Sequence, residues 1–238
     1  MVDGMQFSAA GGRLHSARVD LIGMNLSKMT DAGYKADFGT IQARAIRDRG
    51  LPVPVDLVSS PDFSSGALVD SGRALDVALV GEGFLRATDG TDIYYTRSGG
   101  LHVDAEGQLA LACGFKVVDA GGQPITVARD QKVEIDRMGN VLQGSGSVGR
   151  LDTVRFSDPS RQLVRRRGHF VATDDTVQTE PAECDIAAGM RESSNVTAVQ
   201  AMVELIESSR AFEANMRMVK YQDSTLGTLI NRVGSVPG

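Results

Sequence analysis

The sequence of 238 residues predicts an α+β fold, in which N- and C-terminal helices pair as a coiled-coil-like domain and an antiparallel all-β domain is inserted between them. Three observations predict this fold. The first 51 residues and residues 182–236 contain none of the seven prolines. Both stretches repeat apolar residues at alternating spacings of three and four, as helices that pack on other helices do. Between them, glycine-rich turn signals interrupt short apolar segments, which is typical of antiparallel strands.

Residues 1–50 are expected to be the N-terminal helical segment. Its apolar residues at helical spacing are Phe7, Ala10, Leu14, Ala17, Leu21 and Met24. Three glycines, at 11, 12 and 23, interrupt the pattern, and each costs a helix about 0.5–1 kcal/mol relative to alanine. We therefore expect this segment to fold only against a partner helix.

Residues 190–238 are expected to contain one long C-terminal helix. Its seam runs without a break through Ala198, Met202, Leu205, Ser209, Phe212, Met216, Val219, Asp223, Leu226, Ile230 and Val233. Polar residues at 193–195 can cap its start and Gly234 can end it, so roughly 38 residues would span about 57 Å. Globular helices average about 11–12 residues, so this length favours helix–helix assembly. With residues 1–50 it is expected to form one discontinuous helical domain.

Residues 51–72, which include three prolines and five serines, are expected to be an extended linker, and residues 73–189 a β domain. A weak internal repeat supports the β domain, because 103–109 and 135–141 share the order apolar, Asp, two variable residues, Gly, amide, apolar. Such segments suit hairpin turns, in which the aspartate accepts hydrogen bonds from the backbone of the turn. The ligand ladder of a calcium-binding loop is absent from both, so we expect turns without a metal.

Composition limits the classes of function. The 25 Lys and Arg against 30 Asp and Glu give a net charge of −5, and no segment has a sustained basic face, so nucleic-acid binding is not expected. No stretch approaches the roughly 18 apolar residues of a membrane span, and the first six residues lack the pattern of a signal peptide. With no Trp, 4 Tyr and 8 Phe, the core should be mostly aliphatic.

The sequence predicts no catalytic, cofactor-binding or metal-binding residues, and hence no enzyme and no small-molecule substrate. Its three histidines lie in different segments, and Cys113 and Cys184 make neither a disulfide framework nor a zinc spacing. Residues 144–149 match G-x-G-x-x-G by letter, but an alternating strand pattern follows them where a dinucleotide fingerprint needs a helix. We therefore interpret 144–149 as a hairpin loop.

One basic cluster stands out in this acidic chain. It consists of Arg161, Arg165, Arg166 and Arg167. Because no aromatic residues are interleaved with it, we interpret it as a solvated strand edge or a subunit contact to acidic neighbours.

Three segments carry motifs of a known family. The most specific is similar to L-D-V-A-I-x-G-x-G-F-F followed by Y-T-R-x-G, and its positions are Leu75, Asp76, Gly81, Gly83, Phe84, Tyr95, Thr96, Arg97 and Gly99. A C-terminal segment is similar to S-N-V-N followed by R-x-F-E-x-N, at Ser194, Asn195, Val196, Arg210, Glu213 and Asn215. An N-terminal segment is similar to N-N-L-A-N-x-x-T-P-G-F-K at Asn25, Leu26, Gly33 and Lys35, with Ala32 in place of the proline. Together these motifs resemble the axial proteins of the bacterial flagellum, which include its rod, hook and hook-associated subunits.

The resemblance implies a structural subunit of the flagellar basal-body rod. The short chain with its single β region fits the rod subunits, and residues 212–219 look closer to proximal than to distal rod subunits. Such a subunit would stack helically into the periplasm-spanning drive shaft that transmits motor torque to the hook. Its implied partners are copies of itself, other rod subunits and the flagellar type III export apparatus, with no cleaved signal peptide. A distal rod subunit and a coiled-coil fibre protein of phage-tail or cell-surface type are the alternatives.

The expected assembly interface is formed by the helical seams. Its residues are Phe7, Leu14, Leu21, Met24, Asn25, Leu26, Met202, Leu205, Phe212, Met216, Val219, Leu226 and Ile230. A contact of this kind that does not close on itself builds a filament, and the methionines suit adaptable helix contacts.

Overall fold

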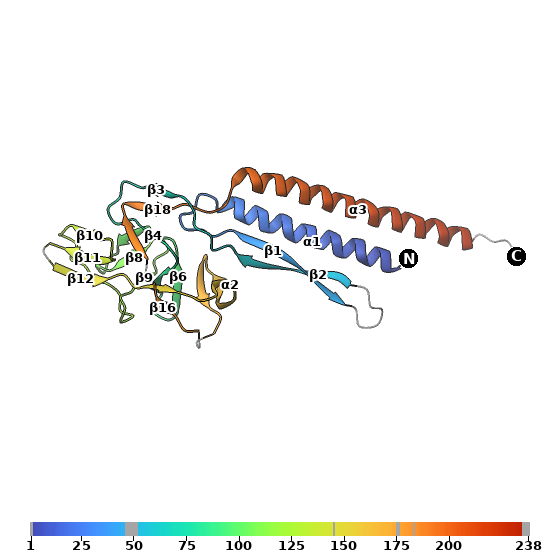
Figure 1. Ribbon diagram of the computed structural model, residues 1–238. Coiled ribbons are helices and arrows are strands. Elements are labelled where there is room, and N and C mark those ends of the chain that lie inside the picture. The colour runs from blue at the N-terminus through green and yellow to red at the C-terminus, as the bar shows by residue number, and fades with distance from the viewer. Residues whose placement is uncertain (1, 46–51, 145, 175–176, 183, 235–238) are drawn as a thin grey trace. The chain divides into compact units, whose positions relative to one another are not determined.

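The computed structural model describes residues 2–45, 52–144, 146–174, 177–182 and 184–234. In these residues it is a mixed α+β structure with three helices and many antiparallel strand pairings, as the sequence predicts. The helices are α1 (Val2–Ser27), α2 (Pro159–Gln162) and α3 (Ala198–Gly234). The chain divides into two compact units (Figure 1): unit 1 comprises residues 1–27, 37–60 and 197–238, and unit 2 comprises residues 28–36 and 61–196. The chain therefore passes between the units four times.

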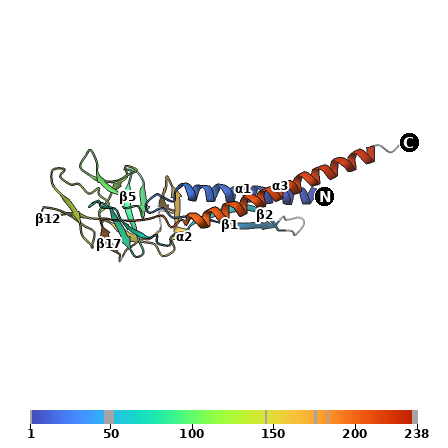
Figure 2. The ribbon, with the colours of Figure 1, turned by 90° about the horizontal axis from the view of Figure 1, so that it is seen from above.

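Unit 1 consists of the two long helices and a two-stranded sheet of β1 (Asp37–Ala45) and β2 (Pro52–Pro61). α1 and α3 lie side by side in opposite directions, and α3 extends beyond the N-terminal end of α1 (Figure 1; Figure 2). Gly11 allows a close approach, because a Cβ at this position would lie 2.9 Å from Asn215 Oδ1. The amide of Asn25 fastens the start of β1: its Nδ2 donates to Asp37 O at 2.6 Å and its Oδ1 accepts from Asp37 N at 2.9 Å.

The N-terminal helix is shorter than the predicted helical segment 1–50. α1 ends at Ser27, residues 37–45 form β1, and residues 52–61 of the expected linker form β2. The helix prediction rested on the absence of proline, which does not exclude a strand. Phe38, Thr40 and Ile41 are aromatic or β-branched, and such residues favour strands.

α3 covers 37 residues, or about 55 Å, close to the long helix that the sequence predicts. Its packed stripe is rotated from the predicted seam. One row, Leu205, Phe212, Val219 and Leu226, is partly buried as expected. The other packed row is Ala201, Ser208, Asn215 and Gln222, whereas of the predicted second row Ser209 is partly buried and Met202, Met216 and Asp223 are exposed. Ala201 is 9% and Ser208 3% exposed, whereas Met202 is 50% and Met216 48% exposed. Ala201 and Asn215 are smaller than Met202 and Met216, and smaller side chains let two helices pack at a shorter distance, which favours the rotation.

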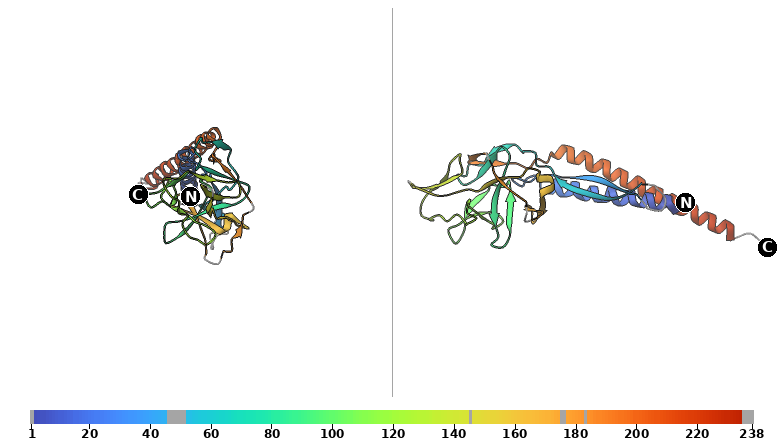
Figure 3. Two further views of the ribbon diagram at one scale, coloured as in Figure 1. Left: turned by 90° about the vertical axis from the view of Figure 1, so that its left-hand side faces the viewer. Right: turned by 60° about the horizontal axis from the view of Figure 1, so that its bottom comes forward.

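Unit 2 is built from antiparallel strands (Figure 3). Its strands are β3 (Leu68–Asp70), β4 (Val77–Val80), β5 (Phe84–Thr88), β6 (Ile93–Thr96), β7 (Leu101–Val103), β8 (Leu109–Leu111), β9 (Lys116–Val117), β10 (Val133–Ile135), β11 (Asn140–Gln143), β12 (Gly146–Arg150), β13 (Thr153–Arg155), β14 (Leu163–Arg166), β15 (His169–Ala172), β16 (Glu180–Pro181), β17 (Asp185–Ala188) and β18 (Met190–Glu192). The largest sheet has the order β14-β15-β6-β5-β9-β8-β7, and β13 joins β16 to β5. A second sheet has the order β10-β11-β12, and two pairs, β4 with β17 and β3 with β18, join early and late parts of the chain.

The core of unit 2 has an aliphatic and an aromatic part. The larger cluster is mainly aliphatic, as the composition predicts, and Val77, Leu101 and Leu109 in it are fully buried. The smaller cluster gathers several of the few aromatic residues, with Phe63 and Phe84 packed edge to face at 5.4 Å. Five of the 12 Phe and Tyr residues therefore lie in this smaller cluster.

Both copies of the internal repeat form hairpin turns, as predicted. Asp104 Oδ1 accepts from Gln108 N at 2.7 Å between β7 and β8, and Asp136 Oδ1 accepts from Asn140 N at 2.9 Å between β10 and β11. A third turn of this kind escaped the sequence comparison, because a proline ends its pattern at residue 124. There Asp119 Oδ1 accepts from Gln123 N at 3.0 Å. Residues 144–149 lie in a hairpin, but most of them are not a loop: residues 146–149 belong to β12 and pair with β11, and residue 145 lies outside the described residues.

Gly99 occupies a position where no side chain fits. A Cβ there would lie 1.8 Å from the carbonyl oxygen of Val77, whose N–H donates to Gly99 O at 2.9 Å. We expect Gly99→Ala to lower the free energy of unfolding by about 3 kcal/mol or more, measured by urea titration, because the backbone must shift. Gly146→Ala is the matched control, since nothing lies within 4 Å of its added Cβ, and it should change stability by less than about 0.5 kcal/mol. Equal effects of the two substitutions would contradict the steric explanation.

The turn at Asp136 predicts a dependence of stability on pH. The side-chain hydrogen bond from Asn140, and then backbone N–H bonds, lower the pKa of Asp136 from its ordinary value of 3.8. A carboxyl group with a lowered folded-state pKa contributes stability above its unfolded pKa, and this stability is lost as the pH falls through the folded pKa. We therefore expect the difference in unfolding free energy between the natural protein and Asp136→Asn to narrow as the pH falls below 3.8. Urea titrations at a series of pH values measure it, and a difference independent of pH would be inconsistent with this role.

Candidate functional site

Unit 2 brings together motif positions from three distant parts of the sequence. Lys35 lies before β1, Arg97 directly follows β6, and Asn195 lies shortly after β18. Glu192, at the end of β18, joins them although it is not a motif position. These four residues, here called the junction cluster, are connected by hydrogen bonds and ion pairs through neighbouring backbone groups.

The carboxylate of Glu192 lies between two cations. Lys35 Nζ donates to Glu192 Oε1 at 2.5 Å, and Arg97 Nη1 lies 3.5 Å from Glu192 Oε2. The exposed fractions of these side chains are 0% for lysine, 4% for arginine and 1% for glutamate. Lys35 Nζ also donates to Ser64 O, and Arg97 Nη2 to Gly81 O, each at 2.7 Å. These additional hydrogen bonds offset part of the cost of removing the charges from water.

Burial dominates the electrostatics of both cations. Burial lowers the pKa of Lys35, and the hydrogen bond and charge of Glu192 oppose this effect. Burial likewise lowers the pKa of Arg97, and again the charge of Glu192 opposes it. Both cations therefore depend on one carboxylate. The interior would hold uncompensated positive charge without it.

Asn195 connects the segments through which the chain enters and leaves unit 2. Its Oδ1 accepts from Ala36 N at 2.7 Å, and its Nδ2 donates to Asp62 O at 2.9 Å. Residues 36, 62 and 195 each lie within two residues of a passage between the units. The hydrogen bonds of Asn195 thus connect, within unit 2, the chain segments next to three of the four points where the chain passes between the units. This arrangement suits a structural role, because the side chains hold separate segments of the chain together.

The other motif positions occupy turns, the core and the helix surface. Leu75 is half-buried and Asp76 is buried, and both precede β4, while Gly81 and Gly83 precede β5. Phe84 and Tyr95 lie in the aromatic cluster. Thr96 Oγ1 accepts a hydrogen bond from Ser98 N, and Ser194 Oγ accepts one from Val196 N. Arg210 and Glu213 are exposed on α3. Asn215 lies on the packed stripe of α3, where its Nδ2 donates to Ala211 O at 2.9 Å.

The predicted seam residues differ in exposure. Leu21 is buried, whereas Phe7, Leu14, Asn25, Leu26, Leu205, Phe212, Val219 and Leu226 are partly buried and Met24, Met202 and Met216 are exposed. The side chain of Ile230 lies outside the described residues. Their part in assembly stays a prediction.

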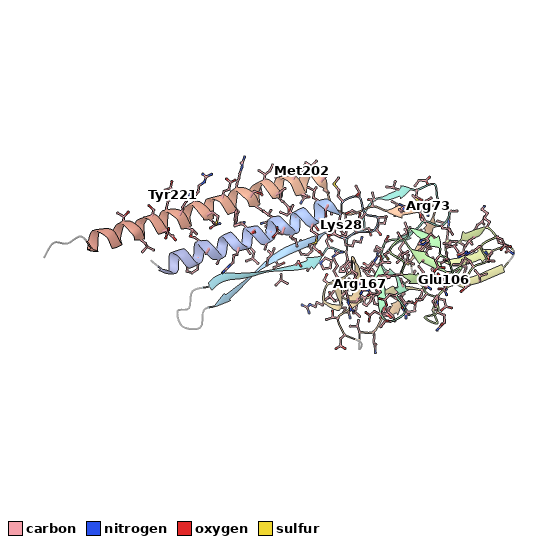
Figure 4. All side chains as sticks on the ribbon, turned by 180° about the vertical axis from the view of Figure 1, so that it is seen from behind. Lys28, Arg73, Glu106, Arg167, Met202 and Tyr221 are labelled. Atoms are coloured by element: carbon pink, nitrogen blue, oxygen red, sulfur yellow. The ribbon has the colours of Figure 1, made fainter. Side chains whose placement is uncertain are left out.

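α3 carries a second apolar stripe, of which only Met202 belongs to the predicted seam. Val199, Met202, Val203 and Ile206 are 73%, 50%, 51% and 53% exposed, and we call them the outer stripe. Their spacing is i, i+3, i+4 and i+7, so they share one helix face. This spacing can be read from the sequence, but the heptad pattern followed above assigns only one apolar face to the helix. Figure 4 labels Met202 on this stripe and Tyr221, 72% exposed, farther along α3.

The described residues include no group of three or more His, Cys, Asp or Glu side chains that could hold a metal ion. Cys113 and Cys184 are both free thiols. Within the part of the chain that the structure describes, none of the helices combines the length and the hydropathy that a membrane span requires.

Two family models match parts of this chain. Residues 78–143 match the "Flagellar hook protein FlgE/F/G D1 domain", and residues 187–232 match the "Flagellar basal body rod FlgEFG protein C-terminal" domain. The first range includes Arg97 and both predicted turns, and the second includes Glu192, Asn195 and most of α3.

Several curated proteins are similar to the chain over most of its length. The flagellar basal-body rod protein FlgF of Caulobacter vibrioides is 28% identical over 226 residues, which cover 92% of each chain. FlgF of Escherichia coli is 29% identical and covers 85% of this chain and 87% of its own. The flagellar basal-body rod protein FlgG of Bacillus subtilis is 24% identical and covers 97% of this chain and 99% of its own.

The junction cluster predicts that two Glu→Gln substitutions will differ greatly in their effect on the free energy of unfolding. Glu192→Gln should lower the free energy of unfolding by about 3–5 kcal/mol, because it leaves two buried cations without a carboxylate. Glu180→Gln removes an exposed ion pair with Arg155, in which the glutamate is 66% exposed, and should cost about 0–1 kcal/mol. Urea titrations followed by circular dichroism compare the two. Similar losses would show that the charge of Glu192 does not support unit 2.

Proposed function

We propose that this chain, which is a flagellar basal-body rod protein of the FlgF type, assembles helically with itself and with other rod subunits to build the proximal part of the drive shaft. Both matched family models and the relatives named FlgF and FlgG support a structural rod subunit. We propose no enzymatic activity, cofactor or small-molecule substrate for it. Its position would be in the flagellar basal body.

The outer stripe is the observation that carries the self-assembly proposal. Four neighbouring apolar side chains on one face of α3 are each at least 50% exposed. A contiguous exposed apolar patch marks an interaction surface in a water-soluble protein. If the surface that receives this stripe lies elsewhere on the next subunit, the contact does not close and the assembly grows as a filament.

The arrangement of the helices suits an inner layer of the assembly. α1 and α3 pack on each other, yet α3 leaves apolar side chains unpacked on a second face. We propose that neighbouring subunits complete a coiled-coil-like layer through this face and through the predicted seams, with the β domain outside. The glycines in α1 lower its intrinsic helix stability, which agrees with a helix that becomes fully stable on assembly.

The proximal position rests on comparative evidence. The FlgF relatives of Caulobacter vibrioides and Escherichia coli are 28–29% identical, and the FlgG relatives of Agrobacterium fabrum and Bacillus subtilis are 24% identical. The sequence of residues 212–219 also favours the proximal type. A distal rod subunit is the alternative within the family. Export through the flagellar type III apparatus, without a cleaved signal peptide, is proposed from the family resemblance.

A double substitution on the outer stripe tests self-assembly. Val203→Glu with Ile206→Glu places two carboxylates on a face that would be buried between subunits, and buried unpaired charges are strongly unfavourable. We expect the variant to fold normally by circular dichroism but to abolish rod formation and swimming when it replaces the natural gene. Electron microscopy of isolated basal bodies and motility in soft agar measure these outcomes.

Ala214→Glu with Ser224→Glu is the matched control, because both positions are exposed on α3 outside the stripe. It adds the same charge and should support rods and swimming. Complete rods from the stripe variant would refute the proposed contact. A purified natural chain that forms a stable trimer, measured by sedimentation, would favour a coiled-coil fibre protein instead.

A further inference from the structure

Unit 2 contains a cleft that the proposed function does not use. It has a volume of about 740 Å³, and segments 28–34, 96–102, 111–113 and 167–170 line it together with Arg73 and Arg191. A volume of this size accommodates a few residues of a peptide loop. All of its lining residues belong to unit 2.

The charged side chains of this cleft are mostly cationic. Lys28, Arg73, Arg167 and Arg191 line it, and their side chains are 50%, 56%, 64% and 36% exposed, so we call it the basic cleft. Asp31 is the one carboxylate among the described lining residues, and it pairs with Lys28 at 2.9 Å. Figure 4 labels three of the four cations, which come from separate segments of unit 2.

Two of the arginines, Arg73 and Arg191, interact with the buried carboxylate of Asp76. Asp76 is fully buried, and its Oδ2 accepts from Arg191 Nε at 2.6 Å. Arg73 Nε lies 3.9 Å from Asp76 Oδ1, and its Nη2 donates to Leu101 O at 3.4 Å. These contacts restrain the two guanidinium groups through Nε and, in Arg73, Nη2, and the side chains remain 56% and 36% exposed. Guanidinium groups held in this way suit the planar recognition of carboxylates.

A third arginine is kept at a strained backbone position. Arg167 and Gly168 form the two-residue turn between β14 and β15, and Arg167 has φ = 52°. Such turns favour Asn-Gly or Asp-Gly, and an arginine in this conformation costs about 1 kcal/mol. Its guanidinium Nη1 lies 3.3 Å from the partly exposed Asp89. Strain of this kind is common where a side chain has a binding role.

The charge of the rest of unit 2 is complementary to this cleft. Unit 2 contains 16 Lys and Arg but 21 Asp and Glu, whereas unit 1 contains nine of each. The whole net charge of −5 therefore lies on unit 2, although its cleft is cationic. Its hairpin turns carry exposed acidic side chains, such as Glu106 between β7 and β8 (Figure 4).

We propose that the basic cleft binds an acidic hairpin turn from unit 2 of a second copy of this chain. The cleft and the acidic turns are different surfaces of one molecule, so the contact is heterologous and can repeat from subunit to subunit. The inference rests on the proposed rod function but concerns a contact separate from the outer stripe. Electrostatic complementarity of this kind fixes register and specificity more than it adds affinity.

Cross-linking of the full-length chain tests which carboxylate enters the cleft. A water-soluble carbodiimide joins lysine amines directly to carboxylates, and a mixture of ¹⁴N- and ¹⁵N-labelled chains distinguishes links between copies from links within one copy. We expect mixed-isotope peptides that join Lys28 to an Asp or Glu of a unit 2 hairpin turn. Finding only same-isotope links from Lys28 to Asp31 would overturn the proposal.

Neutral variants provide an independent test by sedimentation velocity over a range of protein concentrations. Arg73→Gln with Arg167→Gln should weaken self-association about fivefold or more at low ionic strength. Added salt should likewise weaken the self-association of the natural chain. Arg161→Gln with Lys132→Gln is the matched control, because these side chains are 89% and 78% exposed outside the cleft. A thermal melt checks that each variant is folded. An equal loss in both variants, or no loss in the first, would overturn the proposal.

The two proposals fail separately. Loss of rods with the Val203 and Ile206 variant, together with unchanged association of the cleft variant, would remove only the basic cleft contact. Normal rods with the stripe variant would remove the proposed helix contact whatever the cleft variant does.

Discussion

The burial of one carboxylate between two cations is the constraint on which unit 2 depends. Glu192 compensates Lys35 and Arg97, and all three side chains are at most 4% exposed. Such a group is stable only when all partners are present, because each ion left alone in the interior is strongly unfavourable. It therefore specifies one arrangement of the segments that carry these residues. Asn195 extends the same constraint to Ala36 and Asp62, and hence to the points where the chain leaves unit 2.

The sequence predicts those features that depend on local pattern. The long α3 and the two turns at Asp104 and Asp136 follow from spacing and turn chemistry, whereas residues 146–149 form part of β12 instead of the predicted loop. β1 and β2 were not predicted, because a proline-free stretch is compatible with both a helix and a strand. The rotation of α3 was missed because heptad spacing gives the period of the contact but not how closely the partner helix approaches. Here Gly11 allows Asn215 to face α1 while Met202 and Met216 remain exposed.

The junction cluster could be predicted only in part. Lys35, Arg97 and Asn195 are motif positions, but composition alone assigns lysine, arginine and glutamate to the surface. Glu192 carries no signal in the sequence, since its role follows from the pairing of β18 with β3, which places the end of the β domain beside its beginning.

The two units differ in the charge and the apolar exposure of their surfaces. Unit 1 has balanced charges and exposed apolar side chains on α3, whereas unit 2 carries the net negative charge around a basic cleft.

The distance along the chain between Lys35 and Glu192, 157 residues, has a consequence for the order in which the protein becomes structured. A ribosome releases the N-terminal part first, so both cations of the cluster leave the exit tunnel well before their carboxylate. Until Glu192 emerges, burying Lys35 and Arg97 is electrostatically unfavourable. The junction cluster can therefore be completed only late in synthesis, after the strands between Arg97 and Glu192 have already left the tunnel.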